Sequence, residues 1–188
     1  NGVYEIIDTP KPQDDLIGFH DTKPYKQRLK EARKKTGLHC SMVVATGNVK
    51  NIPITAIASD FDFLGASIEA AEGEAFLAAA DHAIKNKQPL VIFSAGGGMR
   101  MQGGMISLNQ MPRTTLAVNE VKRNGLPYIV VLCDPTAGGI TASYAMLGDI
   151  HLAEPNATVA FAGARVIQGT VKESLPIGFQ KSEYLVDK

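Results

Sequence analysis

Apolar residues in this chain fall either in short continuous runs or at every third or fourth position, and the two patterns predict different elements. Continuous runs predict strands at residues 41–46, 54–59, 89–93, 127–132 and 157–163. Helical spacing predicts helices at residues 67–86, 101–108, 112–124, 140–148 and 164–174. Short apolar strands separated by helices are typical of an α/β fold with largely buried strands.

The N-terminal part is more polar. Residues 1–22 are rich in Pro and Asp and predict an extended lead-in, followed by a single domain over residues 23–188. Residues 23–35 predict a helix that Gly37 ends, and seven of these residues are Lys or Arg. A solvated basic face is the favoured interpretation, and attraction of a phosphorylated ligand is the alternative.

Composition excludes several classes of protein. The 19 basic and 19 acidic residues give no net charge, which disfavours a general binder of nucleic acid or of anionic membranes. Cys40 and Cys133 form no CxxC pair, so we expect neither a disulfide framework nor a zinc site, as in a reducing compartment. No apolar run approaches the roughly 20 residues of a membrane span. These features predict a cytoplasmic protein.

The most informative pattern occurs twice: an apolar strand runs into paired glycines and then into a predicted helix. The first instance is FSAGGGMRMQGG at residues 93–104, and the second is CDPTAGG at residues 133–139. A helix N-terminus has unpaired N–H donors, and glycine lets a ligand approach the backbone. The turns are therefore candidates to bind a phosphate, a carboxylate or the oxyanion of a reaction intermediate. The alternative is that they serve packing alone.

Three familiar motifs do not fit. The third glycine of a GxGxxG fingerprint would fall on Met101, neither turn carries the lysine of a P-loop, and no GxSxG elbow is present. Ser143 follows the second turn where peptidases resembling ClpP carry their nucleophile. However, the segment that would supply the histidine base ends Phe161-Ala162-Gly163, and His151 is the only histidine nearby. A serine without a base is a poor nucleophile, so a peptidase is disfavoured.

Long segments of the chain carry a family resemblance from about residue 16 onward. They include FHDTKPYKQRLKEARKKTG, FDFLGAS, FSAGGGMRMQGG, PYIVVLCDPTAGGITASYAMLGD, AEPNATVAFAGARVI and LPIGFQKSEYL. With these segments the chain resembles the biotin-dependent carboxyltransferase family, and within it the β subunits of bacterial acetyl-coenzyme A carboxylase carboxyltransferase.

The resemblance implies a ClpP/crotonase-like fold, a superhelix of β-β-α units. It also implies transfer of a carboxyl group from carboxybiotin, borne on the biotin carboxyl carrier protein, to acetyl-CoA, which gives malonyl-CoA for fatty acid synthesis. The implied partners are that carrier and the carboxyltransferase α subunit, in a hetero-oligomer of two α and two β subunits. Because the released biotin anion can take the substrate proton, no side-chain base is required. The missing His, Asp or Cys constellation is then expected.

The family's site positions transfer by motif. The catalytic positions, acting through backbone N–H groups as oxyanion holes, are Gly97, Gly98, Gly138 and Gly139. The candidate substrate-binding positions are Met99, Arg100, Gly163 and Arg165. For Arg100 a structural role is favoured over a ligand contact.

The chain also departs from the family pattern. Gly103 replaces a usual acid, Glu69 replaces a usual glycine, and Met99 is larger than the usual residue. The family's N-terminal four-cysteine zinc ribbon is absent from the sequence, so we expect no metal in this chain. We also expect the C-terminus to be truncated. Two alternatives stay open. Met99, by altering the acyl pocket, favours another acyl-CoA carboxyltransferase or a malonate decarboxylase subunit. The departures at Gly96, where the family usually has Ser, and at Met99 and Gly103 favour a non-catalytic assembly subunit.

Overall fold

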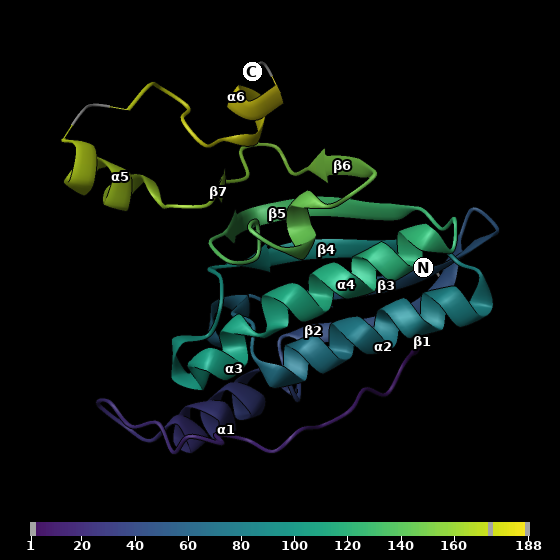
Figure 1. Cartoon of the computed structure of the whole chain (residues 1–188), viewed down its shortest axis with the longest axis horizontal. Coiled ribbons are helices and arrows are strands. Elements are labelled where there is room, and N and C mark those ends of the chain that lie inside the picture. Colours follow the sequence, from purple (N-terminus) through teal and green to yellow (C-terminus); the bar gives the residue numbers. More distant parts are fainter. Residues whose placement is uncertain (1–2, 173–174, 187–188) are drawn as a thin grey trace.

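A single mixed sheet forms the centre of the protein, whose computed structural model describes residues 3–172 and 175–186 (Figure 1). Its strands are β1 (Tyr4–Ile6), β2 (Met42–Val49), β3 (Ile52–Ser59), β4 (Leu90–Gly96), β5 (Tyr128–Ala137), β6 (Ile150–Ala153) and β7 (Val159–Ala160). The first six lie in sequence order; β1, β2 and β3 pair antiparallel, whereas β3 to β6 are parallel, and β7 pairs with the end of β5. Because β4 and β5 are parallel neighbours, their carboxyl ends, and the glycine turns that follow, lie at the same edge.

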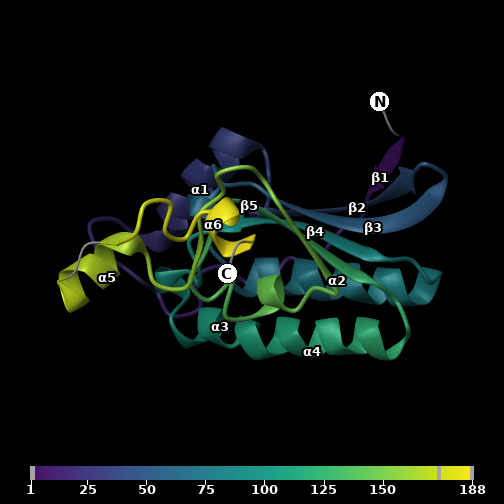
Figure 2. The same cartoon turned by 90° about the horizontal axis from the view of Figure 1, so that it is seen from above.

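The helices cover mainly one face of this sheet. They are α1 (Tyr25–Thr36), α2 (Ala70–Asn86), α3 (Met105–Leu108), α4 (Gln110–Arg123), α5 (Ala164–Val171) and α6 (Ser182–Val186), with 3-10 turns η1 (Leu64–Ala66), η2 (Met101–Gly103) and η3 (Tyr144–Met146). Helices α2 and α4 run side by side beneath the strands, whereas α5 extends away from the sheet in both views (Figures 1 and 2). None of the described helices is both long and apolar enough to cross a membrane.

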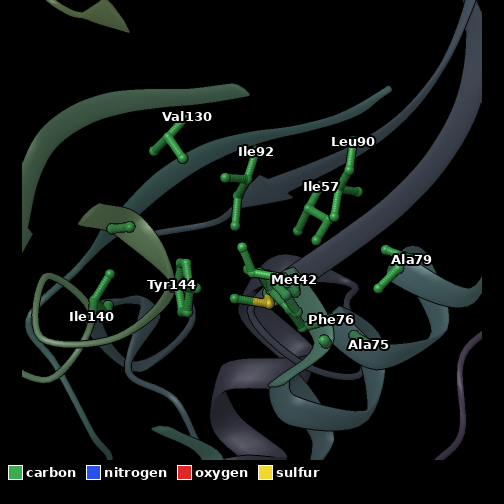
Figure 3. Packing of buried hydrophobic residues seen from close by; sticks show 14 of the residues in the cluster. Met42, Ile57, Ala75, Phe76, Ala79, Leu90, Ile92, Val130, Ile140 and Tyr144 are labelled. Atoms are coloured by element: carbon green, nitrogen blue, oxygen red, sulfur yellow. The ribbon is translucent and has the colours of Figure 1, made fainter. Parts of the chain in front are cut away.

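The core lies between the sheet and helices α2 and α4. Phe76 of α2 packs against Tyr144, with ring centroids 5.0 Å apart (Figure 3), and against Tyr128, with ring centroids 6.3 Å apart. All three side chains are fully buried, and Phe76 contributes on the order of 1.5–3 kcal/mol by leaving water. The predicted burial of the strands holds for one face only, since Ile92 is fully buried while the next residue, Phe93, is 44% exposed.

Helix α1 forms as its sequence predicts. It ends at Gly37, which adopts a left-handed φ of 73° and donates its N–H to the Arg33 carbonyl. Its basic face is partly neutralised by ion pairs to acidic residues of neighbouring segments, such as Arg33 with Asp14 and Lys35 with Asp62. This arrangement agrees with the solvated face favoured from the sequence.

The predicted helix over residues 140–148 is wrong. The structure forms turns there, and only Tyr144–Met146 winds into the 3-10 turn η3. Ser143 adopts φ −135° and ψ −119°, which no helix permits, and its hydroxyl bonds the carbonyls of Gly139 and Ile140. Apolar spacing predicted the buried positions Ile140 and Tyr144 correctly, but serine bonding to nearby carbonyls overrides the helix.

Two other predicted elements are shorter than expected. The helix over residues 101–108 is broken at Gly104, whose φ of 55° and ψ of −131° separate η2 from α3. The strand over residues 157–163 is reduced to β7, because Phe161 and Ala162 form a bend before α5. Both interruptions occur beside the glycine turns and shape that edge of the sheet.

Candidate functional site

The two glycine turns pack directly against each other at the carboxyl edge of β4 and β5. A Cβ added at Gly98 would lie 3.2 Å from the Gly139 nitrogen, and one added at Gly138 would lie 2.9 Å from the Gly97 carbonyl oxygen. Gly98 and Gly138 also adopt left-handed φ values of 121° and 63°. Glycine is thus required at both positions, by the close approach and by the backbone conformation.

Of the paired glycines in each turn, one has a backbone N–H without an acceptor among the described residues. The Gly97 N–H donates to the Gly65 carbonyl at 3.2 Å, and the Gly138 N–H donates to the carbonyls of Ala160 and Phe161 at 3.0 and 3.2 Å. In residues 3–172 and 175–186, no acceptor bonds the N–H of Gly98 or of Gly139. Two neighbouring donors without an internal partner are able to bind a negatively charged oxygen.

A left-handed turn supports the first glycine turn. The successive residues Leu64, Gly65 and Ala66 have φ values of 50°, 66° and 49°, a conformation that costs non-glycine residues on the order of 1 kcal/mol each. This turn directs the Gly65 carbonyl to the Gly97 N–H. The Ala66 carbonyl oxygen lies 2.5 Å from where a Cβ of Gly96 would be. The backbone strain is thus located directly behind the candidate site, where function offsets such a cost.

Hydroxyl groups hold the second glycine turn. The Thr141 Oγ1 donates to the carbonyls of Gly138 and Ala160 at 2.7 and 3.0 Å, and the Ser143 Oγ donates to the Gly139 carbonyl at 2.7 Å. These bonds use the carbonyl groups of the turn and leave the Gly139 N–H free. Ser143 is only 3% exposed, and the His151 imidazole bonds the Ala145 carbonyl instead of this hydroxyl. Ser143 and His151 therefore do not bond each other in this structure.

Arg100 enters a buried cluster of charges behind the first turn. Its Nη2 donates to Glu72 Oε1 at 2.6 Å and to the Ser67 carbonyl at 2.5 Å, and its Nη1 donates to the Tyr25 hydroxyl at 3.1 Å. The Tyr25 hydroxyl in turn donates to Glu69 Oε2 at 3.2 Å. The Arg100 side chain is 2% exposed, so this geometry supports the structural role favoured from the sequence and not a direct ligand contact.

The pKa values of the two carboxylates in this cluster are shifted in opposite directions. Burial raises the pKa of Glu69, and the Arg100 charge offsets this only in part. Burial would also raise the pKa of Glu72, but the Arg100 charge and the N–H donors of Ser41 and Glu69 outweigh it, so the pKa of Glu72 is lowered. Glu72 is thus the firm counter-ion of Arg100, and Glu69 is the more easily protonated neighbour.

The sequence did not indicate this cluster, although Glu69, which belongs to it, and Gly103, which contacts Glu69, both depart from the family pattern. Glu69 and Gly103 lie against each other, since a Cβ added at Gly103 would lie 2.5 Å from Glu69 Cγ. The contributing residues come from distant segments, with Tyr25 in α1, Glu72 in α2 and Arg100 after β4. The capping pattern, in which Glu72 accepts the Glu69 N–H at 3.0 Å, was the one local signal available.

The remaining predicted site positions surround the two turns. Met99 is half-buried and covers the second turn, because a Cβ at Gly139 would lie 2.8 Å from Met99 Cγ. Gly163 is exposed at the start of α5, three residues after Ala160, which accepts the Gly138 N–H. The side chain of Arg165 lies outside the part of the chain that the structure describes.

Other reactive groups are inert or dispersed. Burial raises the pKa of the Cys40 and Cys133 thiols to about 11, so both are protonated near neutral pH. Among the described residues, no three His, Cys, Asp or Glu side chains gather closely enough to hold a metal ion. The chemistry that this edge of the sheet offers is therefore donation from backbone N–H groups.

Known proteins match most of this sequence. The model of the carboxyl transferase domain family matches residues 15–177. The "Acetyl-coenzyme A carboxylase carboxyl transferase subunit beta" of Pelagibacter ubique (strain HTCC1062) is 69% identical over 97% of this chain and 59% of its own length. The protein of the same name from Phenylobacterium zucineum (strain HLK1) is 56% identical over 100% of this chain and 61% of its own length. The chain thus spans about three fifths of the length of these curated relatives.

Solved structures confirm the predicted fold. The transcarboxylase 12S crystal structure has a TM-score of 0.70 at 24% identity, covering 76% of this chain and 28% of its own. The hetero-dimer of Pseudomonas malonate decarboxylase has a TM-score of 0.66 at 22% identity, covering 80% of this chain and 70% of its own. These neighbours share the crotonase-like fold predicted from the sequence. The family model and the curated relatives establish that the chain belongs to the carboxyl transferase domain family.

Proposed function

We propose that this chain is the β component of an acetyl-CoA carboxyltransferase, active together with an α subunit. It would transfer the carboxyl group of carboxybiotin, borne on the biotin carboxyl carrier protein, to acetyl-CoA and so produce malonyl-CoA. The observation that carries the proposal is the pair of adjacent, unpaired N–H donors of Gly98 and Gly139. The names of the curated relatives support the choice of substrate.

The reaction needs stabilisation of negative charge on oxygen at two places. Carboxybiotin supplies the carboxyl group, and its release leaves charge on the ureido oxygen. Loss of a proton from the acetyl methyl group places charge on the thioester oxygen. Fixed N–H donors aimed at such an oxygen lower the barrier, and removal of one typically costs about 10²–10³ in rate.

The residues of this chain fit one of these two oxygens. Gly98 and Gly139 each donate one N–H, and the position beside Gly97 is open, with no heavy atom within 4 Å of an added Cβ. Gly98 is buried, which strengthens its interaction with a charged acceptor because water screens it less. We assign the second oxygen to donors of the α subunit, in a complex of two α and two β subunits.

Met99 is the residue of this chain placed to select the acyl group. Its side chain lies over Gly139 and contacts the region next to both donors. A long, flexible thioether there would alter the space beside the two donors. Exchange of Met99 is therefore expected to change the preference among acyl-CoA substrates.

The test is a carboxyl-transfer assay on the chain with a matching α subunit and carboxylated carrier. Acetyl-CoA, propionyl-CoA and a long-chain acyl-CoA would be compared by kcat/KM, and release of CO₂ from malonate bound to its carrier would be measured in parallel. The proposal predicts the highest kcat/KM for acetyl-CoA. A preference for another acyl-CoA or for malonate would assign the chain to one of the alternative enzymes. A stable complex without any transfer would leave only the assembly role.

A further inference from the structure

Glu69 connects three segments that meet behind the first glycine turn. Its carboxylate accepts the Tyr25 hydroxyl at the start of α1 and lies 3.8 Å from Arg100 Nη1. Its Cγ occupies the space that any side chain at Gly103 of η2 would need. The residue is 5% exposed, so these contacts form without competition from water.

Arg100 transmits this anchoring to the catalytic donor. It follows Gly98 by two residues, and its backbone N–H donates to the Ile68 carbonyl at 2.8 Å. The Ile68 N–H bonds the Gly98 carbonyl at 3.0 Å. These two bonds fix the peptides on either side of Met99, and the Gly98 N–H lies in the peptide directly before them. A shift of Arg100 relative to Ile68 therefore changes the backbone torsions at Gly98 that set the direction of this N–H.

We propose that Glu69 is a positioning residue that, through Arg100, fixes the direction in which the Gly98 N–H points. Arg100 pairs with two carboxylates, that of Glu69 at 3.8 Å from Nη1 and that of Glu72 at 2.6 Å from Nη2. Removing Glu69 leaves the Tyr25 hydroxyl without its acceptor and lets the guanidinium move toward Glu72 alone. The expected effect on carboxyl transfer rests on the proposed function, whereas the expected change in the direction of the Gly98 N–H does not.

The contact between Glu69 and Gly103 makes the inference testable, because the residues at these two positions can be exchanged. Gly103 does not adopt a left-handed φ, so its backbone conformation does not require glycine. A side chain is excluded by Glu69 Cγ at 2.5 Å and by Ser107 Oγ at 2.2 Å from the added Cβ. If residue 69 is glycine, a glutamate at 103 enters the same volume, and the Ser107 hydroxyl, buried and without a partner among the described residues, can donate to it. Glycine at position 69 is well tolerated, because this is the N-cap of α2.

The experiment compares Glu69→Gly, Gly103→Glu and the double exchange, with Glu74→Gln as the matched control. Glu74 is a partly exposed carboxylate of the same helix that pairs with Arg113 outside the cluster. For each variant, kcat and KM are measured in the complex with the α subunit and carrier. The Gly98 amide shift is measured in the full chain labelled with [15N]glycine. Glu69→Gln, which keeps the shape of the side chain, replaces Glu69→Gly if that variant does not fold.

We expect Glu69→Gly to lower kcat about ten- to a hundredfold with little change in KM, as for a misaimed catalytic group. The double exchange should restore kcat to within severalfold and return the Gly98 amide signal to its original position, while Glu74→Gln changes neither. Unchanged kcat and an unchanged Gly98 signal in folded Glu69→Gly would overturn the inference, as would a folded double exchange that stays as impaired as Glu69→Gly. If the unaltered complex transfers no carboxyl group, the proposed function fails, and the Gly98 signal alone decides the positioning role.

Discussion

The two glycine turns present the same group, the N–H of Gly98 and of Gly139, but the protein anchors them by different means. Behind the first turn is a buried cluster of Arg100 with two carboxylates. The second turn is held by neutral hydroxyls and backbone carbonyls, chiefly through Thr141 and Ser143. The first set of contacts joins residues up to 75 positions apart, whereas these hydroxyls bond carbonyls three or four residues earlier and the Ala160 carbonyl 19 residues later. The comparison teaches that one donor depends on long-range electrostatics and the other on neutral, mainly local hydrogen bonds.

The largest effect is expected from breaking the charged anchor at Glu72. In Glu72→Ala, the buried guanidinium of Arg100 loses the partner 2.6 Å away and the free energy of unfolding should fall by about 3–5 kcal/mol. Urea unfolding of the chain measures this. A loss below about 1 kcal/mol would show that the cluster is not the main anchor of the first turn.

A second prediction distinguishes an effect on ligand binding beside the two donors from an effect on the stability of the fold. Gly97 is exposed, and a Cβ there meets no heavy atom within 4 Å, so Gly97→Ala should change stability by less than about 0.5 kcal/mol. The methyl group enters the space next to the Gly98 N–H, and carboxyl transfer should fall about tenfold, equivalent to about 1.4 kcal/mol in the barrier.

Gly169→Ala is the matched control for this variant. Gly169 also has open space around an added Cβ, but it lies in α5, away from the two donors. Its replacement should leave transfer unchanged. Full activity of Gly97→Ala would mean that no ligand occupies the space beside the turn.

The neutral anchor of the second turn should be weaker. Ser143→Ala removes the bond to the Gly139 carbonyl and should lower the free energy of unfolding by about 1 kcal/mol. The same urea titration measures the effect. A loss as large as that of Glu72→Ala would erase the difference between the two turns.

The smallest expected effect is a change in how the free energy of unfolding depends on pH, caused by the two carboxylates of the charged cluster. The pKa of Glu72 is lowered in the folded protein, so its stabilisation is present above the unfolded value near 4.5 and is lost as the pH falls. The pKa of Glu69 is raised, so its contribution is present below 4.5 and is lost as the pH rises through the folded value.

Two variants isolate these opposite slopes. Relative to the unaltered chain, Glu72→Gln should reduce the loss of stability on the acid side of pH 4.5. Glu69→Gln should reduce the loss above that pH. Unfolding free energies measured across this range provide the comparison, and identical slopes in the two variants would contradict the opposite shifts.

Local patterns in the sequence predicted the parts of the site that depend on neighbours in the chain. Apolar runs identified β4 and β5, and the glycines after each run identified the turns. The meeting of the two turns was not predicted and follows from the observed topology, because β4 and β5 are parallel neighbours that end at one edge. The helix over residues 140–148 failed for a local reason too, since side-chain hydroxyls competed for the backbone carbonyls.

What could not be predicted depends on contacts between distant segments. No spacing rule connects Tyr25, Glu72 and Arg100, which meet only after α1 and α2 pack behind β4. Likewise, the free donors could not be distinguished from the paired ones, because Gly65 and Ala160 supply the acceptors from elsewhere in the chain. The departures at Glu69 and Gly103 make sense together, because the structure brings these two positions into contact. Gly103 replaces the acid that is usual in the family, and Glu69 supplies a carboxylate to the cluster instead.

The most direct test of the account is the amide spectrum of the chain labelled with [15N]glycine, in complex with the α subunit. Acetyl-CoA and free biotin would be added separately, and the signals of the four turn glycines followed among the 18 glycines of the chain. The account predicts that at least one ligand moves the amide protons of Gly98 and Gly139 furthest downfield, because their N–H groups are free to bond it. Gly97 and Gly138, which are already paired, should move less. Larger downfield shifts at Gly97 and Gly138, or no shift at any of the four with either ligand, would contradict it.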